Sequence, residues 1–136
     1  MIFDSLNYIK TEILSGDIKT DVKNILSHNG KYNTCVHVSN VAERNALIAE
    51  TYGLDHDKCM IAGLLHDISA VIRPEDMLNY ACANRFDICE AERKLPTSLH
   101  GTEKGYHLFM KRSMRRLRCR WRRPVIDTWN IWLSMI

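Results

Sequence analysis

Residues 61–69 read IAGLLHDIS, an apolar run that ends on an imidazole and a carboxylate, His66 and Asp67. The residues from Met60 to Leu65 carry no charge, so a helix over this stretch should run into the core. An unpaired buried carboxylate costs several kcal/mol, and Asp67 therefore needs a partner. A hydrogen-bond donor, a base or a metal ion could fill that role, and the rest of the sequence has to decide between them.

Helical patterns dominate residues 1–110, whereas no clean alternation of apolar and polar residues predicts a strand. Capping residues, Asn-Gly and Gly stops and the 3.6-residue period mark the helix ends. The predicted helices cover about residues 4–14, 17–29, 32–52 and 55–67, one that begins at Pro74, and about 101–110, with a loop over 92–101. The sequence therefore predicts an all-α fold, a bundle of about six or seven helices.

Size and composition limit the class of protein. The chain has 136 residues, which suits one domain with a single core. It lacks an apolar stretch near the ~20 residues that a membrane span needs, and its N-terminus does not resemble a secretory signal. Five cysteines, with no C-x-x-C pair, predict free thiols rather than a disulfide framework. We therefore expect a cytoplasmic protein without a membrane span.

His37 lies one turn into the long predicted helix, 29 residues before His66. The short turn at Gly53-Leu54 should pack the two helices as an antiparallel hairpin, which places His37 at the same end as His66 and Asp67. Two imidazoles and a carboxylate suit a divalent metal such as Fe, Mn, Co or Zn. A hydrogen-bonded structural His-Asp pair explains the same residues, and spacing alone leaves both interpretations open.

A family resemblance favours the metal. The stretch TCVHVSNVAERNALIAETYGLDHDKCMIAGLLHDISA, residues 34–70, resembles the metal-binding core of the HD superfamily of phosphohydrolases. Residues 31–110 resemble its YqeK-type symmetrical bis(5'-nucleosyl)-tetraphosphatases, with Leu99-His100-Gly101 matching a downstream motif. The resemblance implies that His37, His66 and Asp67 hold a metal, iron in the first instance, and that Asp67 and His100 are catalytic. His100 would contact the substrate phosphates, diadenosine tetraphosphate would be the substrate, and two ADP the product.

The chain also departs from that family pattern. Thr34 and Ala70 stand where the family has an Arg and a Lys that serve the anionic substrate, and a fourth ligand, a distal Asp, is expected beyond Ile136. These departures predict a bundle that is incomplete at its C-terminus and that turns over dinucleoside tetraphosphates poorly. The alternative function is a catalytically impaired HD-fold remnant or a nucleotide-binding protein. Whether the chain forms a homodimer stays an open question.

The composition changes abruptly after residue 110. Residues 1–110 carry a net charge of −4, whereas residues 111–136 carry +7 and all three tryptophans. We therefore predict a domain over 1–110 and a basic tail over 111–136. The resemblance implies an acidic helix at this place, and a frameshift or truncation that replaces it explains the tail best. A genuine basic arm for nucleic acid or an anionic membrane is the competing interpretation, and nucleic-acid binding is not expected.

Other histidines give weaker signals. His56-x-x-Cys59 has the spacing of half a zinc site, but no second pair follows at a suitable distance. His28 should lie exposed beside Asn29-Gly30, and His107 should be exposed or lie behind His100. None of them predicts a separate site.

Overall fold

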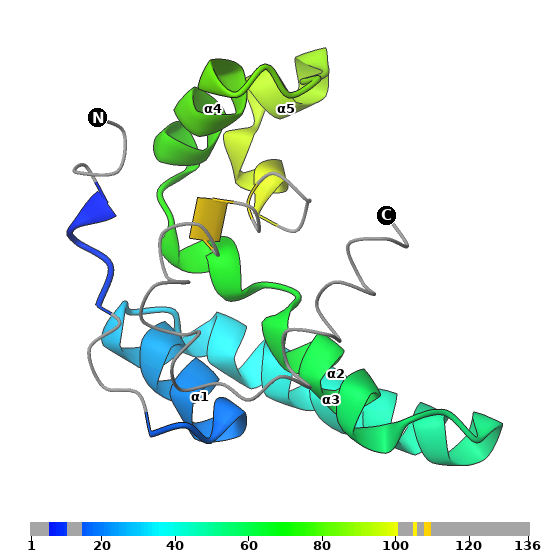
Figure 1. Ribbon diagram of the computed structural model, residues 1–136. Coiled ribbons are helices and arrows are strands. Elements are labelled where there is room, and N and C mark those ends of the chain that lie inside the picture. The colour runs from blue at the N-terminus through cyan, green and yellow to red at the C-terminus, as the bar shows by residue number, and fades with distance from the viewer. Residues whose placement is uncertain (1–5, 11–14, 101–104, 106–107, 110–136) are drawn as a thin grey trace.

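A computed structural model describes residues 6–10, 15–100, 105 and 108–109. All regular elements in these ranges are helical and none is a strand, which confirms the predicted all-α class (Figure 1). Five α-helices and two 3₁₀ turns follow one another there: α1 (Ile18–His28), α2 (Tyr32–Tyr52), α3 (His56–Leu65), η2 (Ile68–Val71), α4 (Pro74–Ala83), α5 (Glu90–Lys94) and η3 (Pro96–Leu99).

Helices α2 and α3 form the predicted hairpin and lie side by side along their length (Figure 1). Gly53 ends α2 with a left-handed φ of 66°, a conformation that glycine adopts without steric cost. The Asp55 side chain then caps α3 by accepting the Lys58 backbone N–H at 3.0 Å. Both ends of the connection are therefore determined by local sequence.

The two helix backbones touch where Gly63 of α3 faces Ala42 of α2. A Cβ atom on Gly63 would lie 2.7 Å from the Ala42 Cα and 2.8 Å from its backbone nitrogen, closer than carbon atoms can pack. Only glycine therefore allows this separation between α2 and α3.

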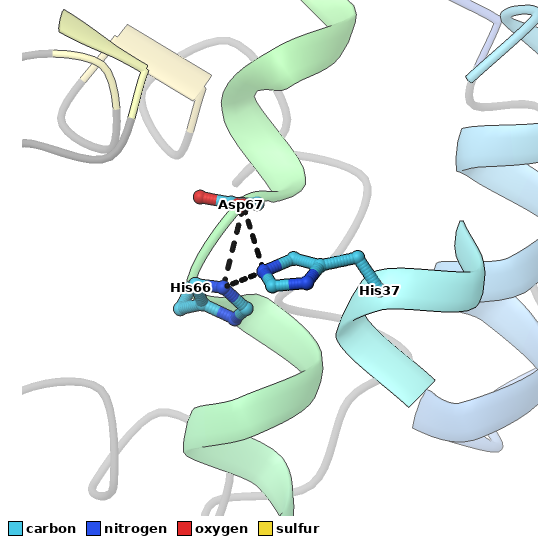
Figure 2. Close-up of side chains that lie close together, drawn as sticks. All are labelled: His37, His66 and Asp67. Carbon is cyan, nitrogen blue, oxygen red and sulfur yellow. Dashed lines mark hydrogen bonds and ion pairs between the residues drawn. The ribbon is translucent and has the colours of Figure 1, made fainter. Parts of the chain in front are cut away.

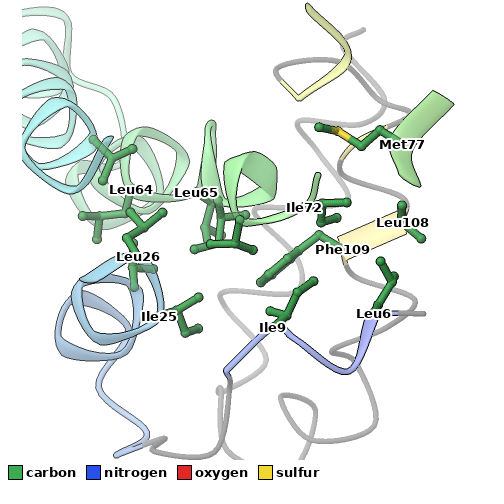
Figure 3. Packing of buried hydrophobic residues seen from close by; sticks show 14 of the residues in the cluster. Leu6, Ile9, Ile25, Leu26, Leu64, Leu65, Ile72, Met77, Leu108 and Phe109 are labelled. Atoms are coloured by element: carbon green, nitrogen blue, oxygen red, sulfur yellow. The ribbon is translucent and has the colours of Figure 1, made fainter. Parts of the chain in front are cut away.

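The apolar run of α3 faces the core, as predicted. Leu64 and Leu65 pack in one buried cluster with Ile25 and Leu26 of α1, and Figure 3 shows this cluster continuing to Phe109. Each such side chain contributes about 1.5–3 kcal/mol when it leaves water. This burial holds α3, and therefore the residues that follow it, in place.

The helix predicted over residues 4–14 is wrong in the part that the structure describes. Leu6 and Ile9 are buried as expected, but residues 6–8 form a 3₁₀-type turn, and residues 9 and 10 have no regular secondary structure. The reason is tertiary: the Asn29 side chain accepts the Lys10 backbone N–H and donates to the Lys10 carbonyl, both at 3.0 Å. Tyr8 similarly donates its hydroxyl proton to Asp76 at 2.8 Å. These contacts replace the helical hydrogen bonds at Lys10.

The loop predicted over residues 92–101 is also wrong in part, because it includes the end of α5 and the whole of η3. Cys89 and Glu92 cap α5 reciprocally, and Lys94 pairs with Glu90 one turn earlier at 2.6 Å. Pro96 begins η3, as its fixed φ allows. Of the helix predicted over 101–110, residues 105, 108 and 109 are described and have helical conformation.

The predicted tail, residues 111–136, lies outside the described residues, so its boundary stays a prediction. None of the helices in the described ranges combines the length and apolarity that crossing a bilayer requires.

We expect Gly63→Ala to destabilise the fold, although alanine is the better helix former by about 1 kcal/mol. The added methyl group has to push α2 and α3 apart at Ala42, and overpacking of this kind costs about 1–3 kcal/mol. Thermal unfolding followed by circular dichroism shows whether Gly63→Ala raises or lowers the stability of the fold. A melting temperature above that of the wild type would contradict the close contact between the helices.

Candidate metal centre

Three side chains converge where α3 ends (Figure 2). His37 projects from α2, His66 caps the C-terminus of α3, and Asp67 follows at the start of η2. The Nε2 atoms of the two histidines lie 3.1 Å apart, and the Asp67 Oδ2 lies 3.5 Å from His37 Nε2 and 3.3 Å from His66 Nε2. The hairpin thus brings together residues 29 and 30 positions apart in the chain.

The triangle formed by these three atoms has the dimensions of a metal site. A cation about 2.0–2.2 Å from each ligand atom separates neighbouring ligands by roughly 2.9–3.6 Å in octahedral or tetrahedral geometry. All three measured separations, 3.1, 3.3 and 3.5 Å, fall in that range. In the described part of the chain, no other group of three or more His, Cys, Asp or Glu side chains is close enough to share an ion.

The backbone selects the tautomer of His66. Its Nδ1 lies 2.7 Å from the carbonyl oxygen of Gly63, and because a carbonyl only accepts, Nδ1 carries the proton. The lone pair of neutral His66 is therefore on Nε2, which points at His37 and Asp67. A carbonyl behind the far ring nitrogen is the usual support of a histidine that ligates a metal.

A hydrogen-bonded cluster without an ion is less satisfactory. The Nε2 of His37 can carry one proton, which can go to His66 or to Asp67 but not fully to both. A divalent cation at the centre of the triangle would satisfy all three atoms at once. The donor set, two imidazoles and one carboxylate, therefore fits a transition metal such as Fe, Mn, Co or Zn.

His66 and Asp67 each shift the pKa of the other. The hydrogen bond with Asp67 raises the pKa of His66, the Gly63 carbonyl adds to this, and burial opposes it. When His66 is protonated on both ring nitrogens, its Nε2–H donates to Asp67, and this hydrogen bond lowers the pKa of Asp67 against the effect of burial. The charge of His66, and then the potentials of His100 and His37, lower the pKa of Asp67 further. Asp67 is therefore a carboxylate, and the site attracts positive charge, whether a proton or a metal ion.

His100 approaches the same carboxylate from the other side. Its Nε2 lies 3.5 Å from the Asp67 Oδ1, the oxygen that does not face His37 and His66. Its Nδ1–H donates to the carbonyl of Thr97, and its own backbone carbonyl accepts the hydroxyl proton of Ser69. Both contacts hold the ring of His100 so that Nε2 faces Asp67.

The remaining sequence candidates lie apart from this cluster. The side chain of His56 is about half exposed and lies next to the turn that joins α2 and α3. It pairs with Glu50 at 3.8 Å and with Asp57 at 3.2 Å. His28 is exposed as predicted, and His107 lies outside the described residues.

Two residues that sequence reasoning missed support the site. Gly63 sets the distance between the helices and also orients His66. An isolated glycine in a helical apolar run signals close packing, so this role had a detectable signal. Ser69 is fully buried and holds His100, which lies 31 residues further along the chain. No local pattern reveals that contact.

We expect metal retention to fall at mildly acidic pH, because a proton and a metal ion compete for the same Nε2 lone pair of His66. The pKa of His66 is raised, so this competition begins at a higher pH than for an isolated histidine, whereas Asp67, with its lowered pKa, stays ionised. Metal content after equilibration across a pH series measures the transition. Full retention down to about pH 4, where carboxylates titrate, would contradict the role of His66.

No curated protein and no solved structure matches the chain. The family model of the HD domain matches residues 34–115. That range contains all four site residues named above, His37, His66, Asp67 and His100, together with most of the described helices. Since it covers more than half of the sequence, the chain belongs to the HD domain family.

Proposed function

We propose that this chain is a metal-dependent phosphohydrolase that cleaves dinucleoside tetraphosphates, such as diadenosine tetraphosphate, symmetrically into two nucleoside diphosphates. The HD domain supports metal-dependent phosphohydrolase chemistry in general. The observation that supports the proposal most directly is the triangle of His37, His66 and Asp67, with a fourth side chain, His100, aimed at its carboxylate.

In this proposal His37 Nε2, His66 Nε2 and Asp67 Oδ2 hold the ion, which we expect to be iron, with Mn, Co and Zn as substitutes. When bound, the ion would supply a Lewis acid that polarises a phosphoryl oxygen and activates water. The chain's own contribution is orientation: the Gly63 carbonyl keeps the His66 lone pair on Nε2, and the α2–α3 contact keeps His37 opposite it.

His100 is the residue that we assign to the substrate. Its Nδ1 proton is engaged by Thr97, so proton exchange with a phosphate chain takes place at Nε2. In hydrolysis, water adds to a phosphorus atom, the bridging P–O bond breaks, and the leaving diphosphate needs a proton or a positive charge. A protonated His100 would supply either one, with Asp67 at 3.5 Å as its electrostatic partner.

The specific substrate rests on the resemblance of residues 31–110, and in particular of Leu99-His100-Gly101, to the symmetrical tetraphosphatases. A second function, an HD protein that binds nucleotide without turnover, is favoured by Thr34 and Ala70. Both are uncharged where the family carries cations that serve the substrate. Binding without hydrolysis by the metal-loaded protein would select this second function.

We expect His37→Ala, His66→Ala and Asp67→Asn each to lower metal affinity. The loss should be at least the 10–100-fold seen when a residue that merely supports a ligand is removed. His56→Ala is the matched control, because His56 is an exposed histidine on the same helix pair and lies outside the triangle. Metal content after gel filtration, together with release of ADP from diadenosine tetraphosphate, measures both effects. Equal metal content in the His56 and His66 variants would contradict the site.

We expect His100→Gln to retain the metal but to lower kcat by about 100-fold or more, because the variant cannot transfer a proton. Ser69→Ala should also lower kcat, but by a smaller factor, because it only releases the backbone carbonyl of His100. Single-turnover hydrolysis at saturating substrate separates this effect from binding. Loss of metal from the His100 variant would instead make it a ligand.

A further inference from the structure

A cleft is formed by residues other than those of the candidate metal centre. A cleft of about 460 Å³ opens between residues 8–10, the turn that joins α1 to α2, and the segment that leads into α4. Its lining includes Lys10, Lys31, Arg73 and His28, and none of the residues that line it is acidic. A concave surface with several cations and no lining carboxylate is suited to an anion.

Hydrogen bonds hold the wall of this cleft on two sides. Asn29 clamps the backbone of Lys10 through both its amide oxygen and its amide nitrogen. Tyr8 accepts the backbone N–H of Arg73 at 2.9 Å, and the Arg73 guanidinium stacks over the Tyr8 ring at 4.3 Å. The cationic groups therefore project from backbone held in one geometry, so a ligand would not have to order it.

In the part of the chain that the structure describes, the two lysines of the cleft have no acidic partner. Arg73 pairs with Asp76 at 2.9 Å, whereas among the described residues the side chains of Lys10 and Lys31 form no ion pair. Lys31 is also the N-cap residue of α2, whose first turn contains no acidic residue and no side-chain cap. The N–H groups at that helix start add positive potential near Lys31.

The cleft and the metal centre share two chain segments. Lys31 precedes His37 by six residues, which corresponds to about 9 Å along α2. On the other segment, Arg73 follows Asp67 by six residues across η2. One extended polyanion could therefore occupy both sites, with one phosphate at the metal centre and the next part of the molecule in the cleft.

We propose that this cleft binds the nucleoside diphosphate portion of the substrate that lies away from the reacting phosphorus, with Lys10 and Lys31 contacting its phosphates. The identity of this ligand rests on the proposed function, but the anion site itself does not depend on a metal. Lys31 precedes Thr34 by three residues and Arg73 follows Ala70 by three, so these two cations of the cleft would supply charge near the positions where Thr34 and Ala70 have none.

The test is isothermal titration of the full chain with ADP in excess chelator at low ionic strength, so that the metal centre cannot contribute. Lys10→Gln and Lys31→Gln should each weaken binding by about tenfold or more, the effect of one charge-assisted hydrogen bond. Lys23→Gln is the matched control, because Lys23 is an exposed lysine of α1 that does not line the cleft. It should bind ADP as the wild type does.

Competition identifies what is recognised. Inorganic pyrophosphate should displace ADP, and adenosine should not. The metal content of both lysine variants should equal that of the wild type, and His66→Ala should keep its ADP affinity in chelator while it loses metal. Failure of the metal-loaded protein to hydrolyse dinucleotides would thus reject the proposed function alone. Absence of ADP binding, an equal loss in Lys23→Gln, or displacement by adenosine would reject the cleft.

Discussion

Gly63 lets the backbones of α2 and α3 touch at Ala42, and its carbonyl oxygen also accepts the Nδ1 proton of His66. One residue thereby sets both the distance between two helices and the orientation of a ring that links them. If the helices were a side chain further apart, His37 could not lie 3.1 Å from His66. The geometry of the candidate metal centre is therefore a consequence of backbone packing.

The α-helix changes to a 3₁₀ turn at His66 and Asp67, and this change lets the two oxygens of the Asp67 carboxylate face different partners. The α-helix ends at Leu65 and the 3₁₀ turn begins at Ile68, so Asp67 lies between them and has a non-helical backbone. One of its oxygens faces the two histidines, and the other faces His100. A carboxylate within a continuous helix could not easily meet partners from two separate elements. Asp67 can therefore connect metal binding with the residue that we assign to the substrate.

Charge is divided between the two neighbouring sites. The metal centre contains an ionised carboxylate and attracts a cation, whereas the cleft around Lys10 and Lys31 has cations and no lining carboxylate. The polyphosphate substrate that we propose would meet both kinds of surface, because its phosphates would bind metal at the reacting end and need neutralisation along the rest of the chain. On this proposal, the cleft would offset the absence of charge at Thr34 and Ala70.

The sequence by itself determined the elements whose signals are local. Capping and periodicity predict the bounds of α2, the left-handed stop at Gly53, the Asp55 cap and the inward face of α3. Because the turn between α2 and α3 is short, the meeting of His37 with His66 and Asp67 was also predictable. Only the tertiary structure decided the rest. Residues 6–10 do not form an α-helix, because Asn29 binds the Lys10 backbone. His100 reaches Asp67 because Ser69 holds its carbonyl, and the basic cleft exists because three distant segments meet. These contacts join residues between 19 and 68 positions apart, and no periodicity or cap encodes which of them will form.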